Sequence, residues 1–145
     1  MKISTKGRYA LRVMVELARL GGEEYIPLKL ISQRQDISMK YLESIVAVLQ
    51  KAGFLISLRG KSGGYKLARA PGTYTAGSII KLTEGSLVPV SCLEEGAAKC
   101  SRADSCPTLP MWVQLEKVID DYLESVTLED LLNNSSDTAG NQYVI

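Results

Sequence analysis

The stretch of sequence that decides the fold covers residues 38–69 and reads SMKYLESIVAVLQKAGFLISLRGKSGGYKLAR. Its first half carries four apolar residues at the i, i+3, i+4, i+7 spacing of an amphipathic helix: Leu42, Ile45, Val46 and Leu49. Ser38 is a suitable N-cap, and Gly53 is a residue type at which helices commonly end. The sequence therefore predicts a helix from Met39 to about Ala52.

The second half of the same stretch contains two short apolar runs that flank a glycine-rich turn. The runs cover residues 54–58 and 65–68, and the turn between them is RGKSGG. Two such runs joined by a turn that contains glycine are typical of a β-hairpin. We therefore expect a hairpin directly after the helix.

Two further helices are predicted ahead of this stretch. The first has its cap at residues 4–5 and runs to about Leu20. The second is short, begins near Pro27 and ends before a tight junction at residues 36–38. The order helix, short helix, turn, helix and hairpin predicts a winged helix-turn-helix over residues 1–85, in a mainly α fold with a small β-hairpin.

Beyond the hairpin we expect a short helix from Thr75 to about Thr83, a loop over residues 86–110 and a long helix over residues 111–132. Five residues of the long helix alternate at three- and four-residue spacing, as in a coiled coil: Trp112, Leu115, Ile119, Tyr122 and Val126. Such a seam can pack on the first domain, but a single winged module binds DNA weakly, so we expect it to form a homodimer. Residues 133–145 are polar and are predicted to be disordered.

Lysine and arginine are concentrated in the first half of this 145-residue chain. Residues 1–70 carry thirteen Lys and Arg against five Asp and Glu, which gives +8, whereas residues 71–145 carry four against eleven, which gives −7. This division favours a nucleic-acid-binding module joined to a part with another role, over a chance partition of surface charge. No apolar run of about 18 residues predicts a membrane span, and the charged start MKISTKGRYALR is unlike a signal peptide, so we expect a cytoplasmic protein.

The exposed side of the helix after Ser38 carries the residues expected to contact double-stranded DNA. They are Ser38, Lys40, Tyr41, Glu43 and Ser44. Glu43 is informative, because a carboxylate near phosphates is costly unless it accepts from a cytosine amine; the alternative is an ordinary solvated helix residue. Cations and close backbone approach suit a phosphate or a narrow minor groove, so four residues of the hairpin turn are also candidates: Arg59, Lys61, Gly63 and Gly64.

All three cysteines lie within fifteen residues of the predicted loop: Cys92, Cys100 and Cys106. The chain contains no histidine. In a reducing compartment such a cluster is more often a metal or redox site than a structural disulfide. Soft thiolates suit an iron–sulfur cluster or zinc, and a thiol–disulfide switch is the alternative. An oxygen donor from a partner subunit or from the loop can complete a metal site, and the local candidates are Asp104, Glu94, Glu95, Ser101 and Ser105.

Four features together resemble the Rrf-type winged-helix transcription regulators over about residues 1–132. They are KGRYALRVMVELA, ISMKYLESIVAVLQKAG, LRGKSGGYKLAR and a cysteine triplet followed by a long helix. The resemblance is closest to the iron–sulfur cluster regulators of this family, and its nitric-oxide sensors are also similar. It implies a homodimeric bacterial transcription regulator whose cluster state alters which operators it binds. Dimerisation itself would place two recognition helices about one turn of DNA apart, so we expect a near-palindromic operator. The DNA contacts that the resemblance implies are Ser38, Lys40, Glu43 and Arg59, and the three cysteines are implied to hold a cluster, 2Fe-2S in preference to 4Fe-4S.

The chain departs from the family pattern around the cysteines. Their spacing is C-x7-C-x5-C, two residues longer in the first gap than in the cluster regulators. Leu109 stands where those regulators have a ligating histidine, and Arg8 stands where the nitric-oxide sensors have an aspartate. A metal-free thiol-redox switch, or a repressor of the same fold that responds to a partner protein, is therefore kept as the alternative. The sequence has no catalytic constellation, so we do not expect an enzyme.

Overall fold

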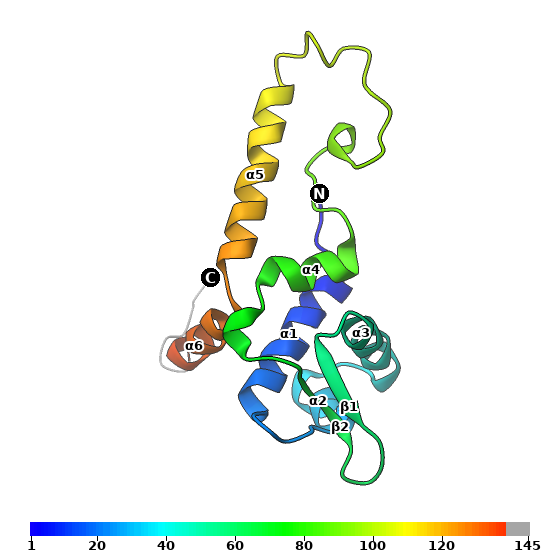
Figure 1. The fold of residues 1–145 in the computed structure, drawn as a ribbon, viewed down its shortest axis with the longest axis vertical. Coiled ribbons are helices and arrows are strands. Elements are labelled where there is room, and N and C mark those ends of the chain that lie inside the picture. Colours follow the sequence, from blue (N-terminus) through cyan, green and yellow to red (C-terminus); the bar gives the residue numbers. More distant parts are fainter. Residues whose placement is uncertain (139–145) are drawn as a thin grey trace.

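The computed structural model describes residues 1–138, and Figure 1 shows their arrangement. This part of the chain forms six α-helices, two short 3-10 helices and one β-hairpin. In chain order they are α1 (Thr5–Leu20), α2 (Leu28–Gln35), α3 (Met39–Lys51), β1 (Leu55–Leu58), β2 (Gly64–Leu67), η1 (Pro71–Thr73), α4 (Ala76–Glu84), η2 (Ser91–Leu93), α5 (Leu109–Ser125) and α6 (Leu128–Thr138). The predicted order of a winged helix-turn-helix and the mainly α fold are confirmed.

The core lies where α1 and α3 meet α4 and the start of α6. All four apolar residues predicted to face inward from α3 are at most 1% exposed. They pack with buried residues of the other elements, which are Ala10, Val13, Met14 and Leu17 of α1, Ile31 of α2, Ile79 of α4 and Leu128 of α6. The Tyr74 ring is fully buried among them, and its hydroxyl donates to the Phe54 carbonyl oxygen (2.8 Å). The apolar spacing of the sequence is thus used as predicted.

A tight turn joins α2 to α3 and fixes where α3 begins. Asp36 adopts the left-handed conformation (φ 53°), which short polar side chains tolerate better than most others. Ile37 is 3% exposed and shares the core cluster with Leu42, in the place expected for a hydrophobic staple. Ser38 then caps α3 by accepting from the Tyr41 N–H (3.2 Å).

The two strands of the hairpin are antiparallel, with Leu55 opposite Leu67 and Leu58 opposite Gly64. The hairpin is also tied to the loop between α1 and α2. The Ile26 N–H donates to the Tyr65 carbonyl oxygen (2.8 Å), and the Tyr65 N–H donates to the Ile26 carbonyl oxygen (2.9 Å). These bonds hold the wing against the helix-turn-helix.

The prediction of one continuous helix over residues 111–132 is wrong, because the chain breaks between α5 and α6. Thr127 and Asp130 form a capping box, in which the Asp130 N–H donates to Thr127 Oγ1 (3.0 Å) and the Thr127 N–H donates to Asp130 Oδ2 (2.9 Å). The Val126 carbonyl oxygen accepts from the Ala76 N–H (2.7 Å). The backbone at the break is therefore satisfied by a new helix start and by the first residue of α4.

The helix α6 begins in the core and continues where the sequence predicted disorder. Leu128 is 0% exposed, and its N–H donates to the Tyr74 carbonyl oxygen (3.0 Å). The predicted disorder is wrong for residues 133–138, which form the end of α6. The remainder of that prediction, residues 139–145, lies outside the described part of the chain.

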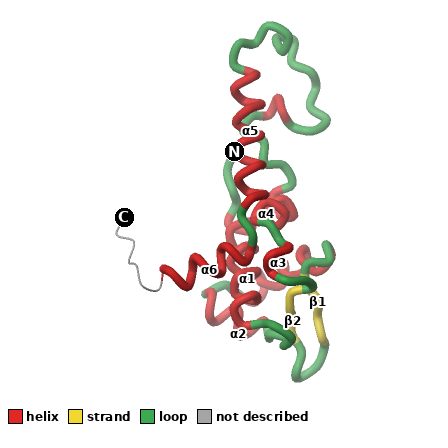
Figure 2. The backbone as a smooth tube through the Cα atoms, turned by 60° about the vertical axis from the view of Figure 1, so that its left-hand side comes forward, coloured by secondary structure: helices red, strands yellow, loops and turns green. Residues whose placement is uncertain are grey.

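The helix α5 and the segment before it project from the winged helix-turn-helix. Figures 1 and 2 show α5 standing clear of the other helices, with residues 86–108, here called the cysteine segment, running beside it. No residue of α5 is buried. Within residues 1–138, no helix is long and apolar enough to cross a membrane.

Candidate DNA interface and cysteine segment

Three of the five residues predicted to contact DNA from α3 are engaged within the chain. The Ser38 hydroxyl accepts the capping bond, and the Ser44 hydroxyl donates to the Tyr41 carbonyl oxygen (2.6 Å). The Tyr41 ring is half-buried and packs edge-to-face on Tyr9 of α1, with ring centroids 5.8 Å apart. Ser38 and Ser44 therefore have less capacity for hydrogen bonds to bases than free serine hydroxyls would have.

Lys40, Glu43 and Met39 have exposed side chains at the N-terminal end of α3. Lys40 and Glu43 form no hydrogen bond or ion pair within residues 1–138, so both charges face solvent. Met39 is 40% exposed and lies one helical turn before Glu43. It is not among the residues predicted from the sequence, because an apolar residue gives no sign of DNA contact. Its thioether side chain can make apolar contact with the methyl group of thymine.

The turn of the wing carries the exposed cations Arg59 and Lys61. Gly63 and Gly64, predicted as DNA contacts, sit where the backbone is crowded. A Cβ on Gly64 would overlap the Ile26 carbonyl group, and a Cβ on Gly63 would overlap the Leu58 carbonyl oxygen. Close packing of the wing is therefore a sufficient reason for both glycines.

The three cysteines lie on the cysteine segment, which connects α4 to α5. Cys92 and Cys100 are exposed, and Cys106 is half-buried. No disulfide joins them in the described structure, and within residues 1–138 no three His, Cys, Asp or Glu side chains gather as metal ligands. Three thiols match the donors of an iron–sulfur cluster in their chemistry, but the segment has to rearrange to bring them together.

Cys106 lies at the start of α5, where its thiolate form is favoured. Its Sγ lies 3.3 Å from Thr108 Oγ1. Hydrogen bonds from the Thr108 hydroxyl, and then from the Thr108 and Leu109 backbone N–H groups, hold the pKa of the Cys106 thiol below its usual value. A lowered thiol pKa favours both metal ligation and oxidation.

The predicted oxygen donors are on the same segment but are not assembled around the thiols. Asp104 forms an ion pair with Lys99 (3.2 Å). Glu94 and Glu95 line a hollow between the cysteine segment and α5, together with Glu116. The described structure thus selects none of these donors as a fourth ligand.

An ionic contact ties the base of α5 to α4. Lys81 Nζ donates to Glu124 Oε1 (2.9 Å) and pairs with Asp120, and the Thr75 hydroxyl donates to Glu124 Oε2 (2.7 Å). Bonds to Asp120 and Glu124 raise the pKa of Lys81, and bonds from Lys81 and Thr75 lower the pKa of Glu124. The C-terminal end of α5 is therefore held against α4, at the Thr75 cap and at Lys81 in the last turn.

A second carboxylate links the C-terminal end of α4 to α1. Glu84, the last residue of α4, accepts from the Ser4 N–H (3.1 Å) and from the Ser4 hydroxyl. A negative charge is favourable at a helix N-terminus, and Gly7 leaves room for it, since a Cβ there would overlap the Glu84 carboxylate. The cysteine segment therefore begins two residues after Glu84, which contacts the start of α1.

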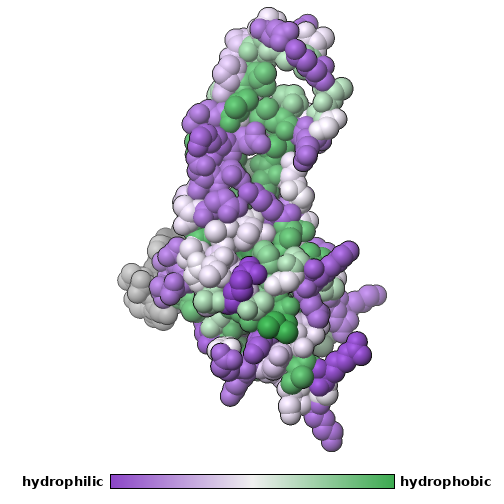
Figure 3. Space-filling view, viewed as in Figure 1, coloured by the Kyte–Doolittle hydropathy of each residue, from purple (hydrophilic) through white to green (hydrophobic). Residues whose placement is uncertain are grey.

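The apolar face of α5 differs in part from the predicted seam. Trp112 and Ile119 are half-buried, and Val126 lies at the break after the helix. The residues that leave most apolar surface exposed at a regular spacing, here called the α5 stripe, are Met111, Leu115, Val118 and Tyr122, with exposures between 39% and 67%. Figure 3 shows apolar surface on this projecting part of the molecule. Leu115 and Tyr122 belong to both sets. At the other two places the exposed residue is the one directly before the predicted residue, so the exposed face lies slightly to one side of the predicted face.

Known proteins similar to this chain are transcription regulators. The Rrf2 family model, described as an iron-dependent transcriptional regulator, matches residues 3–134. The regulator CymR of Bacillus subtilis is 42% identical over 131 residues, which cover 90% of this chain and 89% of CymR. The regulator IscR of Pectobacterium carotovorum is 37% identical over 134 residues, which cover 92% of this chain and 80% of IscR.

A solved structure agrees with these sequence relationships. The structure of B. subtilis CymR, described as the global cysteine regulator, superposes with a TM-score of 0.77 at 40% identity, over 92% of this chain and 98% of that one. These proteins are regulators and not enzymes, in agreement with the expectation from the sequence. The chain belongs to the Rrf2 family of transcription regulators.

Proposed function

We propose that this protein is a homodimeric, sequence-specific DNA-binding regulator whose binding is modulated by an iron–sulfur cluster held by three cysteines. The observation that carries this proposal is the position of Cys92, Cys100 and Cys106. All three lie on the one segment that connects the DNA-binding unit to the projecting helix α5. Binding of a ligand to these thiols would therefore act at the junction between the two parts.

The DNA-binding part of the proposal uses α3 and the wing. Lys40 would contact a phosphate, and Glu43 would accept from a cytosine amine and penalise other bases. Arg59 and Lys61 would place positive charge at a phosphate or in a narrow minor groove. Replacing Arg59 with alanine should weaken operator binding and reduce the slope of log K against log salt by about one. Unchanged salt dependence would contradict this role of the wing.

The α5 stripe supports dimer formation. Its apolar side chains are 39–67% exposed within residues 1–138, and their 4-3-4 spacing suits a helix of a second chain. Two copies related by a two-fold axis would present two α3 helices to half-sites about one turn of DNA apart. The operator should then be nearly palindromic.

The cysteine segment supplies the donors that the proposed cluster requires. Three thiolates would hold it, with a fourth donor from Asp104, Glu94, Glu95 or a partner subunit, and 2Fe-2S is proposed in preference to 4Fe-4S. The cluster would supply a redox-sensitive connection between the three thiols. Gathering Cys92 and Cys106 would shorten the segment between α4 and α5. Because Glu84 at its start contacts α1, this shortening would act on the DNA-binding unit.

The proposed cluster is tested by purification without oxygen, followed by a visible spectrum and assays of iron and acid-labile sulfide. We expect a coloured protein that contains both, and we expect Cys92→Ser, Cys100→Ser and Cys106→Ser each to lose most of the colour. Ser91→Ala, at an exposed serine of the same segment that is not a candidate ligand, serves as the control. A colourless protein without iron after reconstitution would contradict the cluster.

A second candidate is a metal-free thiol switch, and the state of Cys106 favours it. Its lowered pKa promotes oxidation. CymR, which is described as a cysteine regulator, is also among the proteins similar to this chain. In this case peroxide should change operator binding in metal-free protein, and dithiothreitol should restore it. Mass spectrometry would then find a Cys106 disulfide or sulfenate. No response in metal-free protein would leave the cluster, or a regulatory partner protein, as the source of control.

A further inference from the structure

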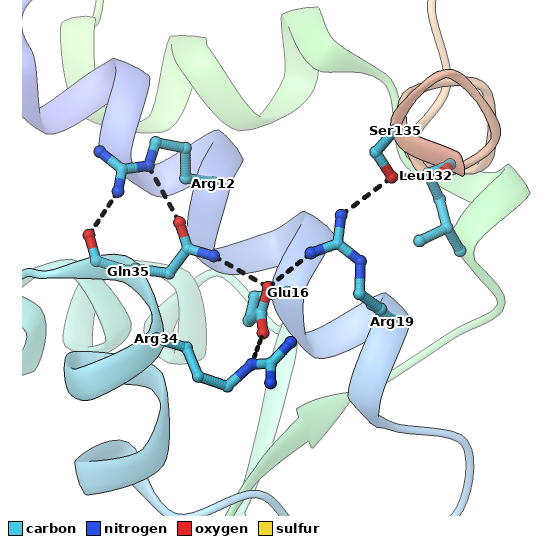
Figure 4. A network of polar contacts seen from close by, with 7 residues as sticks. All are labelled: Arg12, Glu16, Arg19, Arg34, Gln35, Leu132 and Ser135. Atoms are coloured by element: carbon cyan, nitrogen blue, oxygen red, sulfur yellow. Dashed lines mark hydrogen bonds and ion pairs between the residues drawn. The ribbon is translucent and has the colours of Figure 1, made fainter. Parts of the chain in front are cut away.

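A buried carboxylate joins the helix-turn-helix to the C-terminal helix. Glu16 of α1 is 1% exposed, and among residues 1–138 it is the one charged residue that is buried. It accepts from Arg19 Nη1 (2.9 Å), from Gln35 Nε2 (2.8 Å) and from Arg34 Nε. Figure 4 shows these donors converging on it from two helices. Three hydrogen bonds, two of them from cations, offset the cost of removing the charge from water.

Two of these donors lie at the point where α3 is positioned. Arg34 and Gln35 are the last two residues of α2, directly before the left-handed Asp36 and the Ser38 cap of α3. Gln35 is also held from the other side, because Arg12 Nε donates to its Oε1 (3.0 Å) and Arg12 Nη2 donates to its backbone carbonyl oxygen. Side chains of α1 therefore hold the C-terminal end of α2, because they bind both the side chain and the backbone carbonyl of Gln35.

The third donor extends the cluster to α6. Arg19 Nη1 donates to Glu16, and Arg19 Nη2 donates to Ser135 Oγ (2.9 Å). One guanidinium thus contacts both the carboxylate that holds α2 and the helix that follows α5. Its planar fork allows this double contact, which a lysine ammonium does not reproduce with the same geometry.

Stability alone does not require a carboxylate at this place. Replacing a buried ionic group by a well-packed apolar group is often neutral or stabilising. What the carboxylate adds is direction, because each donor has to lie at hydrogen-bonding distance and angle from it. We propose that Glu16 is a positioning residue for α3, and that Arg19 couples the position of α6 to that of Glu16. This inference rests on the proposed function, in which α3 reads the operator.

Positioning and plain stabilisation have different consequences for DNA binding. Phosphate contacts depend mainly on charge and tolerate small displacements, whereas hydrogen bonds to base edges weaken steeply with distance and angle. A shift of the α2–α3 turn should therefore reduce affinity for the operator and leave affinity for random DNA almost unchanged. A loss of folded protein would lower both by the same factor.

The first test uses Glu16→Gln, which keeps the side-chain size and replaces one acceptor oxygen by a donor. Fluorescence anisotropy would compare a duplex obtained by in vitro selection on the wild-type protein with a random duplex of equal length. We expect operator affinity to fall about tenfold, the effect of one lost base contact, and affinity for random DNA to change less than about twofold. Glu24→Gln, an exposed carboxylate with the same charge change, is the control and should alter neither.

Arg12→Lys covers the case in which Glu16→Gln does not fold. It lies on the surface and keeps the charge, but one ammonium cannot hold both oxygens of Gln35 as the guanidinium does. We expect a selective operator loss of about threefold, as for one weakened hydrogen bond. An unchanged ratio of operator to random affinity in a folded Glu16→Gln or Arg12→Lys protein would overturn the positioning role.

The α6 arm has its own test in the pair Arg19→Lys and Ser135→Ala. We expect each to reduce operator affinity slightly, and the double variant to be no weaker than Arg19→Lys alone, because both remove the same contact. Additive losses would overturn the coupling. Glu43→Ala separates these results from the proposed function. If it leaves operator discrimination intact, α3 is not the reading element, whereas discrimination lost in Glu43→Ala but kept in Glu16→Gln defeats only the present inference.

Discussion

The DNA-binding unit, residues 1–85, and the projecting part, residues 86–125, are held together by different means. The first contains all but one member of the core cluster, and its buried side chains are close to 0% exposed. The second has no buried residue in α5, and its cysteines lie on a largely exposed segment. The first part is ordered by its own packing, so the second is where a second chain or a bound ligand has the most order to add.

The largest expected effect tests the first half of this comparison. Leu49→Ala should lower the free energy of unfolding by about 2–5 kcal/mol, because it opens a cavity at a fully buried site. Val113→Ala on α5, where the side chain is 48% exposed, should change it by less than about 0.5 kcal/mol. Urea denaturation followed by circular dichroism measures both. Equal effects would mean that α5 is packed as tightly as the core.

The next effect concerns the α5 stripe and the second chain that we propose for it. Leu115→Glu would place a charge in the dimer interface once from each copy, which should weaken dimerisation by about a hundredfold, or ~2.7 kcal/mol. Analytical ultracentrifugation across a dilution series would show the shift to monomer. Val113→Glu makes the same chemical change on the other side of α5 and should leave the dimer intact. A dimer that tolerates Leu115→Glu would move the interface away from the stripe.

The fold of residues 1–85 could be predicted from sequence because its signals are local. The spacing of Leu42 and its partners, the Ser38 cap and the glycine-rich turn each define one element without knowledge of the others. The break at residues 126–127 was missed although its signal is present. Thr127 and Asp130 have the spacing of a capping box, and the coiled-coil alternation that continues to Val126 obscured it.

The candidate site could be predicted in its residue types but not in its geometry. Lys40, Glu43 and the three cysteines are where the sequence placed them, since chain order decides which element carries them. Glu16 gave no signal, because its partner Gln35 is nineteen residues away and the pairing exists only when α1 and α2 are packed. Which oxygen completes a cysteine site is equally non-local.

A smaller effect is expected for Met39, which brings an apolar group to the polar end of α3. If Met39 contacts a thymine methyl group, Met39→Ala should weaken operator binding about fourfold, the value of one buried methyl-sized group. Replacing the contacted thymine by deoxyuridine should weaken wild-type binding similarly and have no further effect on the variant. Anisotropy with thymine-to-uracil duplexes measures this. Additive losses would show that Met39 acts elsewhere.

The smallest effect tests whether the two parts are mechanically joined at Glu124. Its contact with Lys81 and Thr75 lowers the pKa of the Glu124 carboxyl, so the ionised form is favoured in the folded protein. This contact then stabilises the folded protein above the ordinary carboxyl pKa of about 4.3. The stabilisation is lost as the pH falls through the lower pKa that the carboxyl has in the folded protein. Glu124→Gln should cost about 0.2–1 kcal/mol at pH 7, the range for exposed ion pairs, and nothing at a pH where the wild-type carboxyl is protonated.

Melting curves of wild type, Glu124→Gln and the exposed control Glu24→Gln between pH 7 and pH 3 would measure this convergence. Wild type and Glu124→Gln should differ in melting temperature at pH 7 and converge in acid, whereas Glu24→Gln should match wild type throughout. The contact joins α5 to the Thr75 cap of α4 and to Lys81 in its last turn, so its loss should also increase amide hydrogen exchange in α5 more than in α3. Equal exchange in both helices would mean that α5 keeps its place without this contact, and would leave the contact of Glu84 with Ser4 as the proposed link between the cysteine segment and the DNA-binding unit.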